Sequence, residues 1–252
     1  MEGLTSTAPF RSGRLLARAV IVLLALGALF ELVGIGSALF QIRMLSRAAA
    51  GDYPSDDEVM GNDLREAGVA LGQVSVYVLT VVTFCVWLYR VYQNLPALGN
   101  ARESLNYSPG WAVGYFFIPF ANLVMPYRAV KEVWQKSTPV EEGEDPALAW
   151  LREPSALLPA WWAAWLLSNI SNNLLFRFSS GAETPEGLLT ISKFRLAVAV
   201  LDIAAAALAA LVVKAIDERQ EARSRQVTYF TGPPMPPPFT PLHAEAGRPT
   251  NA

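Results

Sequence analysis

The stretch YSPGWAVGYFFIPFANLVMPYRAVKEVW, residues Tyr107–Trp134, is apolar enough to enter a membrane but is interrupted too often to cross it as one helix. At 1.5 Å per residue, the roughly 15 mostly apolar residues from 111 to 125 reach about 22 Å, less than a hydrocarbon core of about 30 Å. Pro119 and Pro126 each remove a backbone donor and clash with the preceding turn. We therefore predict a Pro-broken re-entrant or interfacial segment over 107–137.

The rest of the chain carries long apolar blocks of a length that suits a membrane helix. Of its 252 residues, 52% are hydrophobic and 17% are charged, whereas soluble domains have about 25% charged residues. The apolar residues gather in four blocks, which we predict to be transmembrane helices. The predicted fold is all-α, a polytopic membrane bundle with spans at about 19–40, 69–88, 160–176 and 196–216.

Composition excludes several classes of function. The formal net charge of −2 offers no concentrated basic face for nucleic acid. Cys85 is the sole cysteine, so no intramolecular disulfide can form. His243 is the sole histidine and lies in the C-terminal tail, so the bundle has no histidine for a catalytic dyad or a metal site. We expect no catalytic residues, no metal and no cofactor.

Charge distribution predicts the topology. With four spans and the N-terminus inside, 14 of the 20 Lys and Arg residues fall on the inner side and 6 on the outer side. If residues 111–125 formed a fifth span, the inner side would hold 8 and the outer side 12, and the better orientation would reverse. The charges therefore favour a cytoplasmic location for the broken segment and for both termini, in a multi-pass protein of a cell membrane.

The chain divides into a cytoplasmic N-terminus at 1–18, a membrane domain at 19–216 and a cytoplasmic Pro-rich tail at 217–252. The acidic stretch 51–66 is expected to be a solvated connector, because it lacks the ligand spacing of a calcium loop. The run GPPMPPPFTP in the tail predicts an extended, disordered chain, and docking to a partner protein is the alternative.

The segment after Pro126 shows an amphipathic pattern. Tyr127, Val130 and Trp134 recur at helical spacing, which predicts a short helix lying on the inner membrane surface. Aromatic residues throughout the stretch are expected to form an interfacial belt, and a lipid or small-molecule groove is the alternative. The belt would contain Tyr107, Trp111, Tyr115, Tyr127 and Trp134.

The combined pattern W-x-x-R-x-x-x-N, SPGW, IP-x-x-N-L-x-x-PY and E-x-W-x-x-S resembles a family of bacterial integral-membrane proteins of unknown function, DUF4328. The resemblance covers about 63–216 and implies a multi-span membrane domain without an assigned activity. Besides Ile118, Leu123, Glu132 and Ser137, the residues that carry it are Trp87, Arg90, Asn94, Ser108, Pro109, Gly110, Trp111, Pro119, Asn122, Pro126, Tyr127 and Trp134.

Polar residues inside the predicted spans are the main lead to a site, because a charge at a helix centre costs about 2.5–3.5 kcal/mol on insertion scales. In the predicted topology they lie at one level, at or outside the midplane, with no Lys or Arg deep enough to pair with the acids. They could form a polar cluster, or they could simply hydrogen-bond the helices together. The candidate cluster comprises Glu31, Gln73, Asn169, Asn172, Asn173 and Asp202.

Two readings of function follow. The first is a non-enzymatic membrane protein in which the broken segment supports scaffolding, lipid contact or a partner interaction. The alternative is a small transporter or channel subunit that uses Glu31, Asp202 and Asn172. The expected partners are the lipid bilayer and, through homo-oligomerisation or the Pro-rich tail, another protein; nucleic acid is not expected.

Overall fold

A computed structural model of the chain describes residues 9–141, 143–145, 148, 155–179, 181 and 184–231. Throughout these ranges the regular structure is helical, with no strand. The α-helices are α1 (Arg14–Ala49), α2 (Asp56–Gln93), α3 (Pro109–Gly114), α4 (Met125–Lys136), α6 (Leu157–Ser179) and α7 (Pro185–Thr231). Short 3₁₀ turns lie between α2 and α4, namely η1 (Pro96–Leu98), η2 (Arg102–Ser104), η3 (Tyr115–Phe117) and η4 (Ala121–Leu123).

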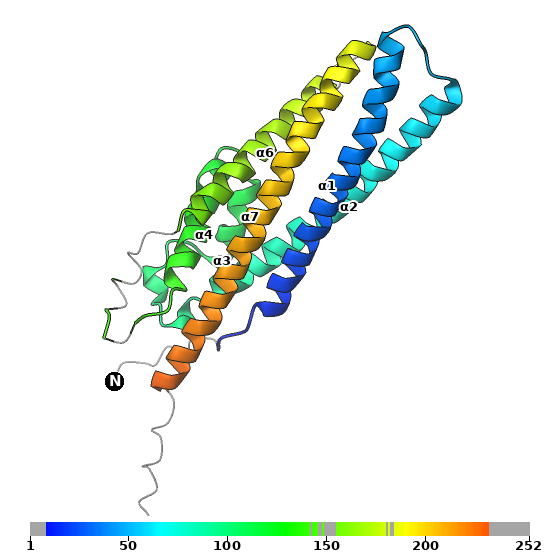
Figure 1. Cartoon of the computed structure of the whole chain (residues 1–252). Helices are drawn as coiled ribbons and strands as arrows, with labels where there is room; N and C mark the ends of the chain where they lie inside the picture. The colour runs from blue at the N-terminus through cyan, green and yellow to red at the C-terminus, as the bar shows by residue number, and fades with distance from the viewer. Residues whose placement is uncertain are drawn as a thin grey trace, which may run out of the picture.

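The long helices lie side by side in the order α2, α1, α7, α6 (Figure 1). At one end of this row, α3 and α4 pack against α2, and α4 also contacts α7. We call this the closed end; it comprises residues 9–24, 84–137, 155–166 and 208–231. The remainder of the row, toward the α1–α2 and α6–α7 connections, is the open half; it comprises residues 27–49, 56–76, 168–179 and 185–205.

Among the described residues, three helices are long and apolar enough to cross a membrane: α1, α2 and residues 186–227 of α7. In the most apolar 18-residue stretch of each helix, only 11% of the residues of α1, 11% of those of α2 and 28% of those of α7 are buried. Most of the apolar side chains therefore face outward, as they do in lipid. α6 has 23 residues but does not meet the same criterion. Its tryptophans and asparagines lower its mean hydropathy, and its membrane crossing stays a prediction.

The acidic stretch 51–66 is mostly exposed, as expected, but from Asp56 onward it is helix, which corrects the expectation of a connector. α2 begins at Asp56, and the connection from α1 is confined to residues 50–55. The Ser55 side chain accepts from the Glu58 N–H, and the Glu58 carboxylate accepts from the Ser55 N–H. This capping box, with acids in the first turn of the helix, stabilises a helix start that apolar periodicity does not reveal.

α7 extends further than the predicted fourth span and reaches Thr231. Residues 217–231, expected in the tail, are therefore helical. Gln220 is 2% exposed and Ile216 is fully buried, so the extension packs against the closed end. The Pro-rich run and His243 lie outside the described residues.

The segment 107–137 is broken, as its prolines predict. α3 ends at Gly114, two 3₁₀ turns follow, and α4 begins at Met125. Phe120, directly after Pro119, has φ of 63°, an unusual value for a residue with a side chain. α3 and α4 contact each other across this break, so the chain bends within the segment.

α4 does not present its apolar stripe to the membrane, which corrects the expected orientation. Val130 is fully buried and Trp134 is 4% exposed, both in the core of the closed end. The Arg219 guanidinium lies 3.6 Å from the Trp134 ring centroid. Trp134 is therefore a core residue, not a member of an aromatic belt, whereas Trp111 is 55% exposed.

Candidate functional site

The closed end has a continuous core, built around Trp87 of α2 and Trp162 of α6. Phe84 contacts Trp87, and Phe116 forms T-shaped ring pairs with both Phe84 and Trp162. The Trp162 Nε1–H donates to the Leu123 carbonyl at 3.2 Å, which fastens η4 to α6. The broken segment is thus packed against two long helices.

A buried carboxylate organises the polar part of this core. Glu132 is 5% exposed, and its Oε2 accepts from the Tyr92 hydroxyl at 2.5 Å. Its Oε1 accepts from the Asn106 backbone N–H at 2.9 Å and from the Asn106 side-chain amide at 2.8 Å. The Tyr92 oxygen in turn accepts from the Tyr107 N–H at 3.0 Å. Several donors therefore hold one acid and join α2, α4 and the loop before α3.

A second buried network joins the segment before α1 and the last part of α7 to this core. Asn94 donates to the Arg11 carbonyl at 2.9 Å and to Gln220 Oε1 at 3.1 Å, and its own Oδ1 accepts from the Arg11 N–H at 3.2 Å. Gln220 donates to the Val91 carbonyl at 2.8 Å and to Ser137 Oγ at 3.1 Å. Each amide bridges elements distant in sequence, which fixes how they pack.

A polar pocket of about 310 Å³ lies beside Glu132, between α4 and the loop before α3. Burial lowers the pKa of the Lys136 ammonium group below its ordinary value, while the Glu132 carboxylate opposes the shift. Burial raises the pKa of the Tyr107 hydroxyl, and the Arg128 charge opposes that shift. The lining residues are Asn106, Tyr107, Arg128, Lys131, Glu132, Gln135 and Lys136.

In the open half, the structure joins Glu31 to Gln73, whose amide donates to Glu31 Oε1 at 3.1 Å. Gly34 makes this approach possible, because a Cβ at that position would lie 2.9 Å from Gln73 Nε2. Two members of the predicted cluster therefore form a direct contact between α1 and α2, at a point where a small residue lets the helices approach.

Asp202 joins α7 to α6 in a similar way. It accepts from the Ser168 hydroxyl, and from the Asn172 amide at 3.1 Å to each carboxylate oxygen. The other two asparagines of the predicted cluster bond within α6: Asn169 donates to the Trp165 carbonyl, and Asn173 accepts from Arg177. The structure thus assembles part of the predicted cluster as two separate hydrogen-bonded groups.

An arginine inside the row was missed by the sequence argument, which placed no basic residue near the acids. Arg195 of α7 bonds Glu66 of α2 at 2.5 Å, and both Arg195 and Asp202 lie within electrostatic range of Glu31. Glu66 also accepts from the Ser37 hydroxyl. The signal was present in the sequence, because Arg195 lies within reach of the predicted fourth span.

A further polar contact extends this group toward the helix connections. The Arg65 guanidinium donates to Ser37 Oγ at 2.8 Å and to Asn62 Oδ1 at 2.6 Å. Asn62, Arg65, Ser37 and Glu66 therefore form one chain of polar contacts between α1 and α2. Glu31 lies further along α1, toward the closed end. The closed end begins beyond Glu31 with apolar side chains such as Val20 and Leu24.

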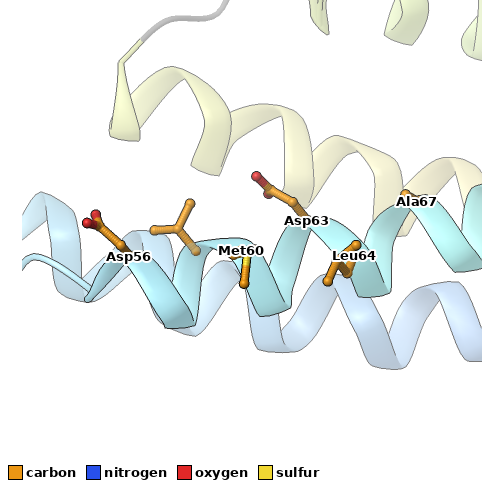
Figure 2. A pocket seen from close by; sticks show the side chains of 6 residues that line it. Asp56, Met60, Asp63, Leu64 and Ala67 are labelled. Carbon is orange, nitrogen blue, oxygen red and sulfur yellow. The ribbon is translucent and has the colours of Figure 1, made fainter.

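A shallow depression on the outward surface of α2 does not form a comparable site. Figure 2 shows its side chains projecting from a single helix. Asp56, Met60 and Asp63 share that face at helical spacing, but no second element supplies an opposing wall. Among the described residues, no group of three or more His, Cys, Asp or Glu side chains is placed to hold a metal ion.

The residues that carry the family resemblance lie in the last turns of α2, in the broken segment and in α4. Ser108 caps α3 by accepting from the Trp111 N–H at 3.3 Å, Pro109 lies in the first turn of α3, and Pro126 lies in that of α4. A family of proteins defined by a domain of unknown function, DUF4328, matches residues 52–218. The chain belongs to this family.

The matched range begins just before α2 and runs into the last part of α7. It contains the closed-end core of this DUF4328 protein except for the part contributed by α1, and it contains the whole signature. No curated protein and no solved structure gives a significant match to the chain. The match therefore establishes the family, whose function is unknown, and does not assign an activity.

Proposed function

We propose that this DUF4328 protein is a non-enzymatic integral-membrane protein whose broken segment contacts lipid from the cytoplasmic side. One observation carries the proposal: the turn between α3 and α4 exposes large apolar side chains although it is fastened to a well-packed core. Phe120 is 86% exposed, Phe117 63% and Val124 47%. Exposed apolar groups gathered on one short segment are typical of a surface that enters a membrane or meets a partner.

In this arrangement α1, α2, α6 and α7 cross the bilayer. α1 and α6 begin, and α2 and α7 end, at the end of the row that holds α3 and α4 (Figure 1). This supports an even number of crossings, with the broken segment on the same side as the start of α1 and the end of α7. The bias of Lys and Arg toward this side supports a cytoplasmic location. The membrane is a bacterial inner membrane in this proposal.

The core of the segment supports a scaffold role over catalysis. Glu132, the most buried acid of the closed end, is occupied by hydrogen bonds from Tyr92 and Asn106. A carboxylate held in this way stabilises a fold and is poorly placed to transfer protons to a substrate. Partners of the scaffold are the bilayer and a second copy of the chain or another protein, with the Pro-rich tail as one contact.

Lipid contact by the turn can be tested with a single labelled cysteine. In a Cys85→Ala background, Phe120→Cys carries an environment-sensitive fluorophore, and Tyr53→Cys is the matched control in the α1–α2 connection, where Tyr53 is 76% exposed. In vesicles, spin-labelled lipid should quench the label at position 120, and an aqueous quencher should act on the label at position 53. Equal aqueous quenching at both positions would contradict lipid contact.

Topology is tested independently with reporter fusions after Gly61, Asn100, Gly181 and the C-terminus. A cytoplasmic signal at Asn100 and at the C-terminus, with an external signal at Gly61 and Gly181, is the expected result. An external signal at Asn100 would refute the cytoplasmic location of the broken segment.

A small transporter or channel subunit is the second candidate. The succession of polar contacts from Asn62 and Arg65 to Glu66 and Arg195, with Glu31 deeper, favours it, because ionisable groups between membrane helices mark ion or proton pathways. Proteoliposomes with a pH-sensitive dye inside would report proton flux. Flux that Glu31→Gln and Asp202→Asn both abolish would support this candidate, and absence of flux in the wild type would exclude proton transport.

A further inference from the structure

The polar pocket beside Glu132 has one wall made by a single face of α4. Arg128, Lys131 and Gln135 recur at positions i, i+3 and i+7, and Lys136 adjoins them. The opposite face of α4 carries Val130, Val133 and Trp134, which are buried in the closed-end core. Burial of that face fixes the direction of the polar one.

The other wall is made by Asn106 and Tyr107 in the loop before α3, and hydrogen bonds hold this loop in place. Asn106 donates to Glu132 through both its backbone and its side chain, and the Tyr107 N–H donates to Tyr92. Lys136 Nζ donates to Ser104 Oγ at 3.0 Å, which joins α4 to η2 just before this loop. The walls are therefore positioned before any ligand arrives, which lowers the entropic cost of binding.

The exposed guanidinium of Arg128 gives the pocket its preference for an anion. Lys131, Lys136 and one carboxylate, that of Glu132, also line the pocket. This carboxylate already accepts from Tyr92 and Asn106, which partly compensates its charge. Arg128 is exposed and can offer two parallel N–H groups, a geometry that matches phosphate oxygens.

We propose that this pocket binds a phosphate group, and that its source is the headgroup of an anionic phospholipid in the leaflet next to α4. The lipid source rests on the proposed function, since it requires the broken segment to lie at the membrane surface. The phosphate chemistry does not require it, because Arg128, Lys131 and Lys136 would also receive free phosphate from the aqueous side. Polybasic surfaces beside a membrane bind anionic headgroups through the same charges.

The test uses the full-length chain in a neutral detergent, titrated with dioleoylphosphatidylglycerol and observed by native mass spectrometry. The triple variant Arg128→Gln, Lys131→Gln, Lys136→Gln should bind this lipid about a hundredfold more weakly, given the usual contribution of each basic residue near an anionic surface. The control Arg18→Gln, Arg102→Gln, Lys214→Gln removes the same charge from the closed end outside the pocket and should retain the wild-type affinity. Dioleoylphosphatidylcholine should bind weakly to all three proteins.

Inorganic phosphate distinguishes the sources. If millimolar phosphate displaces the lipid, the pocket accepts phosphate from either source; if it does not, the headgroup is the ligand, and both results support the pocket. Equal lipid binding by the folded triple variant and the wild type would overturn the proposal. Should the triple variant not fold, Arg128→Gln alone changes an exposed side chain and should weaken binding about fivefold; wild-type affinity in that variant would count against the pocket.

Failure of the proposed lipid contact gives a different pattern. Aqueous quenching at position 120 together with pocket-dependent phosphate binding would remove the lipid-contact function and leave the phosphate site in place. Lipid quenching at position 120 together with lipid binding that is insensitive to the triple variant would remove the phosphate site and leave the lipid-contact function in place.

Discussion

The closed end and the open half of the row are stabilised in different ways. At the closed end, Trp87, Tyr92 and Val133 are almost completely enclosed by protein, and Glu132 is held by several hydrogen bonds. In the open half, large apolar side chains such as Leu71 (70% exposed) point outward, and polar side chains lie between the helices. The first region resembles the interior of a soluble domain, whereas the second resembles a membrane bundle.

This difference predicts which region tolerates change. Burial in protein makes the closed end sensitive to the loss of a single polar partner, because the remaining groups have no access to water. Helix contacts in lipid are individually weaker, averaging about 0.6 kcal/mol for a polar pair, because lipid is as apolar as the side chains that it replaces. Substitutions in the two regions should therefore differ in cost.

The largest effect is expected for Glu132→Ala. The change removes the acceptor of the buried Tyr92 hydroxyl and of both Asn106 donors, and the free energy of unfolding should fall by about 3 kcal/mol. Thermal unfolding in detergent, followed by circular dichroism, measures the change. Gln135→Ala, on the same helix and beside the same pocket, should change stability by less than about 0.5 kcal/mol. A loss of stability in Glu132→Ala as small as that in Gln135→Ala would show that the hydrogen-bond network around Glu132 does not stabilise the fold.

A smaller loss is expected where α1 and α2 pack in the open half. In Gly72→Ala the new Cβ would lie 2.2 Å from Phe30 Cε1, so the ring must move, at an expected cost of about 1–2 kcal/mol. Gly68→Ala, one helical turn away, places its Cβ in open space and should gain up to about 1 kcal/mol through helix propensity. Equal responses at the two positions would mean that the helices do not approach as described.

The ion pair between Glu66 and Arg195 should contribute about 1 kcal/mol, measurable as the coupling in a double-mutant cycle with Glu66→Gln and Arg195→Gln. The surface pair Lys214 and Glu218 is the control; its side chains are 63% and 66% exposed, and its coupling should be close to zero. A coupling at Glu66 no larger than the control would indicate that water or lipid headgroups reach this part of the row.

Sequence reasoning was more successful for the architecture than for the contacts. The helical class and family membership were predicted and are confirmed, and the break after Pro119 was expected from the properties of proline. The apolar stripe of α4 was correctly placed on one face, but its partner was wrongly assigned to the membrane. Apolar periodicity identifies a face to be buried and does not distinguish lipid from protein as its cover.

The residues that organise the closed end were harder to find. Gln220 was assigned to a tail because apolar content falls after Ile216, although the helix continues. Tyr92 and Asn106 are unremarkable by composition, and their role depends on tertiary contact with Glu132. Arg195 was counted as a loop charge, and the depth argument for Glu31 therefore omitted a nearby cation. Long-range partners of this kind are fixed by packing and leave no local pattern.

The smallest change, Asp202→Asn, separates structure from function within the open half. An asparagine keeps an oxygen that can accept from Ser168 or Asn172, so stability should fall by only about 0.5 kcal/mol. The same substitution removes the charge that a proton or cation pathway needs. Thermal unfolding and proton flux are measured on one preparation.

A small loss of stability together with loss of flux would assign Asp202 to transport. A small loss of stability in a protein whose wild type shows no flux would leave Asp202 as a contact between helices. A loss above about 2 kcal/mol would instead show that the open half depends on buried charge as strongly as the closed end does.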